Sequence, residues 1–155
     1  METFIHPSSS VSEKALIGEG VNIGPFCYVA DNVRIGSGTM LRSSVKVLDF
    51  VEIGRECNIH ENVVLGGDPQ DTSFHDEETW VFIGDRNTLR ENVTIHRSTG
   101  KDTCTKVGND CFLMEGVHIG HNAVVGDRVT MANKVGLSGF SQVGEEEKAR
   151  LTGHG

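Results

Sequence analysis

Two histidines lie three residues apart in the segment VHIGHN, residues 117–122. The side chains of His118 and His121 can do chemistry, because a neutral imidazole accepts a proton near neutral pH and also binds zinc. The spacing alone allows a metal pair, an acid/base site or two surface residues. A choice among these readings requires the elements that position the two rings.

The VHIGHN segment is part of a six-residue repeat, whose unit is called a hexad below. Every sixth position from Ile5 to Val143 gives 24 sites, of which 21 are Ile, Val, Leu or Met; the exceptions are Asp71, Glu77 and Lys101. A unit of one short strand and one turn cannot bury a face alone, whereas stacked units share a continuous core. The repeat predicts an all-β protein, a parallel β-helix of about eight triangular coils over residues 1–144, followed by a polar tail at 145–155.

The aliphatic sites at every sixth position form one column of equivalent positions, and two other columns of the hexad also show a preferred residue type. Small residues mostly stand four positions after each aliphatic site, and Cys27, Cys57 and Cys111 belong to this column, which favours core packing over metal binding. Glycine follows many aliphatic sites, where we expect a corner to demand a backbone conformation costly for other residues. The polar segments DTSFHDEETW (71–80) and KDTCTK (101–106) interrupt the aliphatic column, and we expect them to be loops that project from corners.

The coil arrangement gives the histidines positions. His60 and His96 each follow an aliphatic site and are separated by six hexads, which corresponds to two coils, so we expect them on one face of the prism. His118 closes a hexad on that face, and His121 begins just past the next corner. These histidines are therefore predicted to gather near one edge.

Composition and charge disfavour several classes of partner. The net charge of −8 argues against nucleic acid or an anionic membrane surface, because both require a basic face. No apolar run approaches the roughly 18 residues of a membrane span, and METFIHPSSS lacks the basic and apolar regions of a signal peptide. We expect a cytoplasmic protein with reduced thiols.

Three segments carry a resemblance to one family. GGDPQD (66–71), IGDRNTLRENVTIHRST (83–99) and LMEGVHIGHNAVVGDRVTMAN (113–133) look like the acyl-carrier-protein-dependent UDP-N-acetylglucosamine O-acyltransferases, hexapeptide-repeat enzymes that begin lipid A synthesis. The resemblance implies a left-handed β-helix and a homotrimer, with acyl carrier protein and UDP-N-acetylglucosamine as partners. Since the repeat ends near Val143, we expect this chain to lack the C-terminal helical domain of the family.

The resemblance also implies roles for the matched residues. His121 would be the general base that takes a proton from the glucosamine 3-hydroxyl as this oxygen attacks the thioester of a 3-hydroxyacyl carrier protein. Gly139 would donate its N–H to the oxyanion, and Asn122 would orient the His121 ring. No metal and no cofactor are implied beyond the phosphopantetheine that carries the acyl donor. The residues expected to line the nucleotide-sugar and acyl-chain pockets are Gln70, Asp71, His96, His118 and Phe140.

Departures from the family pattern leave alternatives open. Phe140 stands where the family has a histidine and Ser73 where it has a lysine, and Asn122 replaces the usual Asp, as in the related N-acyltransferases. One alternative is a trimeric β-helix relative that has lost catalysis. Another is a zinc-dependent enzyme like the γ-class carbonic anhydrases, with His118 and His121 as ligands. The zinc reading leaves the PQD and TIHR segments unexplained.

Overall fold

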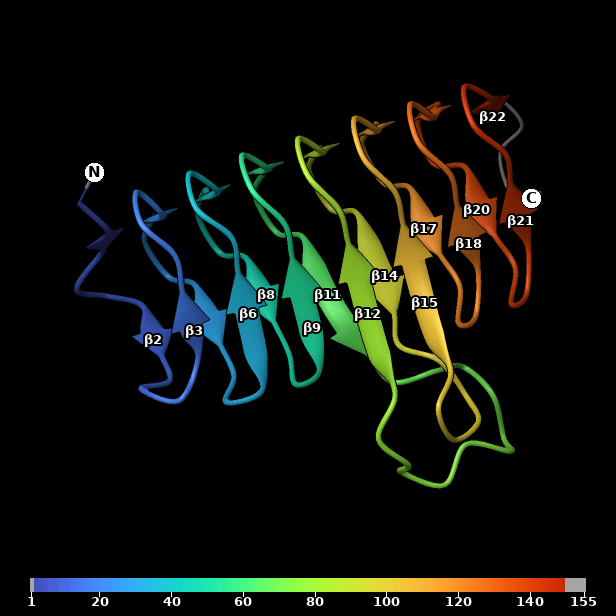
Figure 1. Cartoon of the computed structure of the whole chain (residues 1–155), viewed down its shortest axis with the longest axis horizontal. Coiled ribbons are helices and arrows are strands. Elements are labelled where there is room, and N and C mark those ends of the chain that lie inside the picture. The colour runs from blue at the N-terminus through green and yellow to red at the C-terminus, as the bar shows by residue number, and fades with distance from the viewer. Residues whose placement is uncertain (1, 150–155) are drawn as a thin grey trace.

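The chain winds into a left-handed parallel β-helix whose three sheets form the faces of a triangular prism (Figure 1). The computed structural model describes residues 2–149, which contain 22 short strands and no helix long and apolar enough to cross a membrane. Each strand pairs in parallel with strands of the adjacent coils. The prediction of an all-β left-handed β-helix is therefore confirmed.

The three sheets have eight, seven and seven strands. Sheet A contains β1 (Phe4–Ile5), β4 (Asn22–Ile23), β7 (Met40–Leu41), β10 (Asn58–Ile59), β13 (Thr88–Leu89), β16 (Phe112–Leu113), β19 (Thr130–Met131) and β22 (Lys148–Ala149). Sheet B contains β2 (Ser10–Val11), β5 (Tyr28–Val29), β8 (Lys46–Val47), β11 (Val64–Gly67), β14 (Thr94–His96), β17 (His118–Ile119) and β20 (Gly136–Leu137). Sheet C contains β3 (Leu16–Ile17), β6 (Val33–Ile35), β9 (Val51–Ile53), β12 (Trp80–Ile83), β15 (Cys104–Val107), β18 (Val124–Val125) and β21 (Gln142–Val143).

The strands amount to seven complete coils and the first strand of an eighth. A regular coil comprises three hexads, as the pairing of Asn22 with Met40 shows. The coil from Asn58 to Thr88 is as long as five hexads, and the coil from Thr88 to Phe112 is as long as four, because each contains an inserted loop. Together the two loops lengthen the chain by the equivalent of one regular coil. The predicted number of about eight coils included the residues of these two loops as if they formed one further coil.

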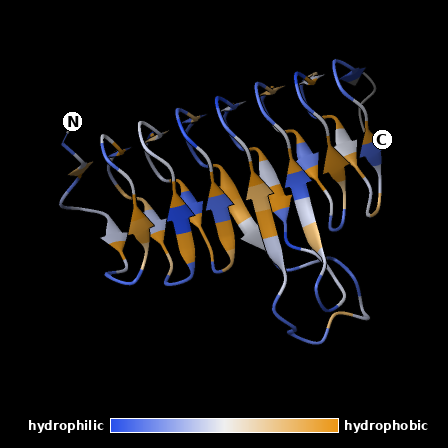
Figure 2. Ribbon diagram, in the orientation of Figure 1, coloured by the Kyte–Doolittle hydropathy of each residue, from blue (hydrophilic) through white to orange (hydrophobic). Residues whose placement is uncertain are grey.

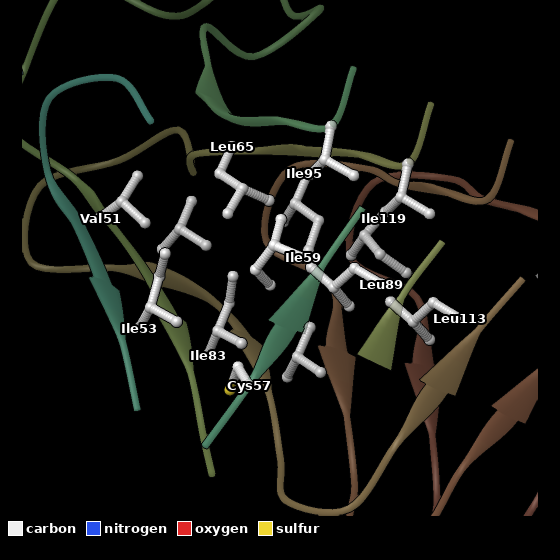
Figure 3. Packing of buried hydrophobic residues seen from close by; sticks show 14 of the residues in the cluster. Val51, Ile53, Cys57, Ile59, Leu65, Ile83, Leu89, Ile95, Leu113 and Ile119 are labelled. Carbon is white, nitrogen blue, oxygen red and sulfur yellow. The ribbon is translucent and has the colours of Figure 1, made fainter. Parts of the chain in front are cut away.

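The core is a set of ladders of aliphatic side chains inside the prism. Ile59, Leu89 and Leu113 stack in register on sheet A, and all three are fully buried (Figure 3). In strands such as β6 and β9 apolar inward residues alternate with a charged outward one, so the ribbon changes colour within the strand (Figure 2), whereas β3 and β18 contain only apolar residues. Branched aliphatic side chains fit this half-buried, pleated surface, which explains why such short strands form.

Three cysteines fill the small-residue column as predicted. Cys27, Cys57 and Cys111 are buried, and the S–H of each donates to a backbone carbonyl of the next coil at 3.0–3.1 Å. Burial raises the pKa of all three thiols. Their role is to pack the core.

The glycines after the aliphatic sites have a different cause from the expected one. A Cβ on Gly54 would lie 2.5 Å from the Gly84 carbonyl oxygen, and a Cβ on Gly36 would lie 2.6 Å from that of Gly54. Adjacent coils approach too closely here for any side chain. The positive φ falls two residues later, at corner residues such as Gly38 (73°) and Asn122 (64°). Strand spacing, not corner conformation, therefore selects this glycine column.

Both inserted loops project from the edge between sheets B and C and lie side by side (Figure 1). The first loop occupies residues 68–79 between β11 and β12, and the second occupies 97–103 between β14 and β15. Two predicted boundaries are wrong, because Trp80 begins β12 and the segment from Cys104 to Lys106 belongs to β15. The Glu77 carboxylate, which accepts the Gly100 N–H at 2.7 Å, connects the two loops.

The β-helix extends past the predicted end of the repeat. Lys148 and Ala149 form β22, which pairs with β19, and Glu146 has the positive φ of a corner residue. The sequence prediction of a polar tail beginning at residue 145 is therefore wrong for 145–149, where polar residues stand on a corner and an outward strand position. The remainder of the predicted tail, 150–155, lies outside the described residues.

Candidate active site

His121 lies at the corner between β17 and β18, on the edge from which both loops project. Its ring is half-buried, and its Nδ1 lies 2.9 Å from Oδ1 of Asn122. Asn122 and, from the following coil, Gly139 therefore adjoin one imidazole. These contacts disfavour the reading of His121 as a free surface residue, which needs none.

The Asn122 amide fixes the proton position on His121. Its Oδ1 accepts the Thr99 N–H at 2.9 Å, and its Nδ2 donates to the Thr99 carbonyl at 3.0 Å. Since backbone donors and acceptors are unambiguous, these bonds identify which end of the amide is oxygen. His121 Nδ1 faces that oxygen and must donate a hydrogen to it. In the neutral ring, Nε2 then holds the lone pair and can act as a base.

Gly139 lies against the basic nitrogen of His121. A Cβ built on Gly139 would collide with His121 Nε2, so any larger residue here would displace the His121 ring. The Gly139 N–H forms no hydrogen bond with any of residues 2–149. A backbone N–H without an internal acceptor next to a basic nitrogen can stabilise an oxyanion that forms between them.

Two further histidines adjoin this corner on sheet B. His96 and His118 come from the neighbouring strands β14 and β17, and their rings meet edge to face with centroids 4.6 Å apart. His118 Nδ1 lies 2.7 Å from the Thr94 hydroxyl. Burial, together with His118 and His121, lowers the pKa of His96 to about 4, and burial followed by His121 lowers the pKa of His118. Both rings are therefore neutral at neutral pH.

The His96 ring has an unused polar atom. Its Nδ1 is buried and has no hydrogen-bond partner among residues 2–149, and the same is true of the Thr99 hydroxyl oxygen. An unpaired buried polar atom costs free energy, so it commonly marks a place where a bound molecule supplies the partner. Both atoms belong to segments that adjoin His121.

The first loop brings Asp71 to the same corner. The Ser73 N–H and hydroxyl donate to Asp71 Oδ1 at 3.0 and 2.8 Å, and these bonds are the main reason that the pKa of Asp71 is lowered. The proximity of the Thr99 side chain and of His121 lowers this pKa further. Gln70, the preceding residue, is exposed on the loop.

Phe140 covers one side of the His121 ring. The two rings meet edge to face with centroids 5.3 Å apart, and the Phe140 N–H donates to the His121 carbonyl at 3.0 Å. Because 65% of Phe140 is exposed, its ring presents an apolar surface beside the base. An aromatic ring at this position can contact a ligand but cannot accept a hydrogen bond as histidine would.

Arg97 holds the two loops together. Its guanidinium donates to the Asp68 carboxylate at 3.1 and 3.2 Å and to the Glu77 carbonyl at 3.2 Å, and it lies over the rings of Phe50 and Phe74. Its side chain is only 11% exposed. The planar guanidinium suits both the carboxylate and the stacked rings. The loop that carries Thr99 to Asn122 is therefore well supported.

His60 does not lie with the other histidines, contrary to the prediction from spacing. It follows β10 on sheet A, whereas His96 ends β14 on sheet B. The first loop lengthens the chain between them by the equivalent of two hexads, so their separation no longer corresponds to two coils. His60 instead forms, with Glu61 and Glu91, the group of potential metal ligands found among the described residues. Arg90 already binds Glu91 at 2.8 Å, which disfavours a cation there.

Sequence reasoning did not find Thr99 or Thr105, whose contacts hold Asn122 in place. Thr99 acts through its backbone, which leaves no signal in the residue type. Thr105 occupies the small-residue column and is fully buried, so its type is consistent with packing alone. The only available signal was a hydroxyl in a column otherwise rich in Val, Ala and Cys.

Comparison with known protein families shows which family the chain belongs to. The family model for bacterial transferase hexapeptide repeats matches residues 14–49, 32–67 and 104–139, more than half of the chain. The chain belongs to the bacterial hexapeptide-repeat transferases. Within this family of transferases, matches over nearly the whole chain identify more specific relatives, the UDP-N-acetylglucosamine O-acyltransferases.

One such hexapeptide-repeat transferase is the acyl-carrier-protein–UDP-N-acetylglucosamine O-acyltransferase of Thermodesulfovibrio yellowstonii, 44% identical over 90% of this chain and 54% of its own length. The crystal structure of the O-acyltransferase from Moraxella catarrhalis superposes with a TM-score of 0.89, with 37% identity over 93% of this chain and 56% of that one. The acyltransferase from Bacteroides fragilis gives a TM-score of 0.87, with 39% identity over 88% and 54%. The predicted resemblance is thereby confirmed, although the chain spans only about half the length of these relatives.

Proposed function

We propose that this chain is the β-helical part of an O-acyltransferase that transfers a 3-hydroxyacyl chain from acyl carrier protein to the 3-hydroxyl of UDP-N-acetylglucosamine, the first step of lipid A synthesis. The observation that carries the proposal is the contact of His121 Nδ1 with Asn122 Oδ1, which leaves Nε2 free to accept a proton beside Gly139. The substrates in this proposal are those after which the related acyltransferases are named.

The reaction needs one base and one oxyanion donor. His121 Nε2 takes the proton of the attacking hydroxyl while its Nδ1–H stays bonded to Asn122 Oδ1, which stabilises the imidazolium that forms. The sugar oxygen bonds to the thioester carbon, and the Gly139 N–H binds the resulting oxyanion. Collapse of the tetrahedral intermediate breaks the carbon–sulfur bond, and the imidazolium returns the proton to the leaving thiolate. Neither a metal nor a covalent enzyme intermediate takes part.

Substrate contacts are proposed for the residues around this base. The unpaired Nδ1 of His96, the His118 ring and the loop residues Gln70 and Asp71 offer polar partners to the nucleotide sugar. The exposed ring of Phe140 offers an apolar surface to the acyl chain. Uncharged histidines suit this role, because a cluster of imidazolium groups would repel one another.

The assembly and the compartment are also proposals. We infer a cytoplasmic homotrimer, in which the neighbouring prism completes the pocket beside the His121 corner. The support is the likeness to the O-acyltransferases, which the resemblance describes as trimers, and the position of His121 on an outer edge of the prism beside the exposed ring of Phe140. Sedimentation of the purified chain should give the mass of a trimer, and a monomer under assay conditions would contradict this part.

The test of the function is thioester-dependent acylation of UDP-N-acetylglucosamine by the purified chain. We expect His121→Ala to reduce turnover by at least about a hundredfold, since general acid–base groups contribute roughly 10² to 10⁴ in rate. The matched control is His60→Ala, which removes another half-buried corner histidine and should leave turnover near the wild-type rate. Equal activity in the His121→Ala and wild-type proteins would exclude His121 as the base.

A further inference from the structure

The corner at Asn122 lacks the hydrogen bond that most other corners have. At most corners the residue with positive φ donates its N–H to a backbone carbonyl of the preceding coil; Lys134 donates to Glu115 at 2.9 Å and Phe140 to His121 at 3.0 Å. The coil that precedes Asn122 is opened by the second loop. The Asn122 N–H instead donates to the Thr105 hydroxyl oxygen at 2.9 Å.

Packing alone does not account for the hydroxyl of Thr105. The residue is fully buried on β15, and it pairs with Val81, which in turn pairs with Val51. Valine therefore fills the equivalent core position in the two preceding coils of sheet C. Threonine has nearly the shape of valine, so the hydroxyl is the feature that distinguishes this coil.

Two separate contacts thus determine the position of Asn122. Thr105 holds its backbone N–H, and the Thr99 backbone holds its side-chain amide at 2.9 and 3.0 Å. If the backbone of Asn122 shifted, its Oδ1 would move away from His121 Nδ1, which lies 2.9 Å away. The neutral ring would then be free to carry its hydrogen on Nε2, and this nitrogen could no longer accept a proton from the substrate.

We propose that Thr105 is a positioning residue for His121, acting through Asn122: its hydroxyl replaces the backbone acceptor that the second loop removes and so keeps His121 in the Nδ1–H form. The catalytic consequence rests on the proposed function. The form of the ring, however, is a property of the folded chain and is measurable without substrate.

The test is ¹⁵N NMR of the histidine rings in the full chain, with the His121→Gln variant to assign the His121 signals. At a pH where the ring is neutral, we expect the wild-type protein to carry the hydrogen on Nδ1. Thr105→Val should reduce the Nδ1–H form to less than half of the molecules, and Thr105→Ser should restore it. A folded Thr105→Val protein with wild-type His121 signals would overturn the proposal.

A matched variant separates this role from loss of a buried hydroxyl in general. Thr39 is also fully buried, and its hydroxyl accepts the Cys57 N–H at 3.0 Å at another corner. Thr39→Val should leave the His121 signals unchanged. If Thr105→Val does not fold, the wild-type spectrum still decides, because a ring with its hydrogen mainly on Nε2 contradicts the proposal.

Kinetics then link the tautomer to the reaction. Because Thr105→Val should leave less than half of the molecules in the Nδ1–H form, we expect it to lower kcat at least about twofold with little change in KM, with recovery in Thr105→Ser. A wild-type chain with the Nδ1–H form but no acyl transfer would refute the proposed function and leave the positioning role intact. Unchanged kcat in Thr105→Val would refute its catalytic consequence.

Discussion

At the scale of single residues, the environment of His96 differs most from that of a surface histidine. Its ring is packed against His118 and next to His121, and its Nδ1 has no partner among residues 2–149. Desolvation disfavours the imidazolium form, and two neighbouring imidazoles add repulsion when they are charged. The fold therefore keeps three histidines close together only while His96 and His118 remain neutral.

This environment predicts acid sensitivity. The pKa of His96 is about 4 in the folded chain against the ordinary 6.5, so the unfolded chain binds more protons between these values. His96 therefore does not lower the free energy of unfolding above about pH 6.5, and it lowers this free energy increasingly as the pH drops towards 4. We expect His96→Gln to weaken this fall in the free energy of unfolding, measured by urea denaturation at several pH values. His75→Gln, in the exposed part of the first loop, should retain the wild-type pH dependence; the same retention in His96→Gln would contradict the assignment.

At the scale of elements, the glycine column sets how closely the coils stack. Gly36, Gly54 and Gly84 follow one another along the corner between sheets C and A, and each faces the backbone of the next coil. The corner conformation is provided separately, by residues such as Gly38 with φ of 73°. Glycine thus serves two different physical purposes in this fold, and they respond differently to substitution.

Gly54→Ala should therefore destabilise the chain more than a substitution at a corner glycine. The new Cβ would lie 2.5 Å from the Gly84 carbonyl oxygen, and the backbone has to move to admit it. Overpacking of this kind costs about 1–3 kcal/mol. Gly38→Asn is the matched comparison, because asparagine tolerates positive φ and its Cβ would meet only the flexible Glu56 side chain at 3.3 Å. Chemical denaturation measures both values, and an equal loss in the two variants would be evidence against this distinction.

The strands and loops also show which parts of the fold could be predicted from the sequence. The aliphatic column predicted the strands correctly because burial on the inside of each coil requires an aliphatic residue at every sixth position. It could not assign faces between the two loops, since the first insertion is two hexads long and so keeps the six-residue count while moving the chain to another face. His60 was misplaced for this reason. The second insertion, of one hexad, completes a coil and restores the faces. The contact of His96 with His118 depends on pairing across a coil that the second loop enlarges, and the orientation of Asn122 depends on backbone groups of Thr99, neither of which a residue type reveals.

At the scale of the whole molecule, the chain is a one-dimensional stack. Every strand pairs only with the strands of the adjacent coils, so interior coils have two neighbours and the first coil has one. The first coil is also poorly covered, since Ile5, the core-facing residue of β1, is 39% exposed, whereas its partner Ile23 in the next coil is fully buried. In such a stack, stability is a sum of coil and interface contributions.

Hydrogen exchange should follow this arrangement. We expect the amides of β10 and β13 to exchange slowest and those of β1, β2 and β3 fastest, because a terminal coil opens without disturbing the interior. Mass spectrometry of peptides from exchanged protein measures the gradient along the chain. Uniform protection from β1 to β13 would instead show that the chain opens only as a single unit.

The buried cysteines have a practical consequence. Cys27, Cys57 and Cys111 point into the prism with raised pKa values, so neither access nor thiolate formation favours their reaction with an alkylating reagent. Cys104, by contrast, is only half-buried and begins β15 directly after the second loop. The native sequence therefore already offers a single preferred attachment point for a fluorescent or spin label, next to the loop that holds Asn122, without any cysteine having to be removed or introduced.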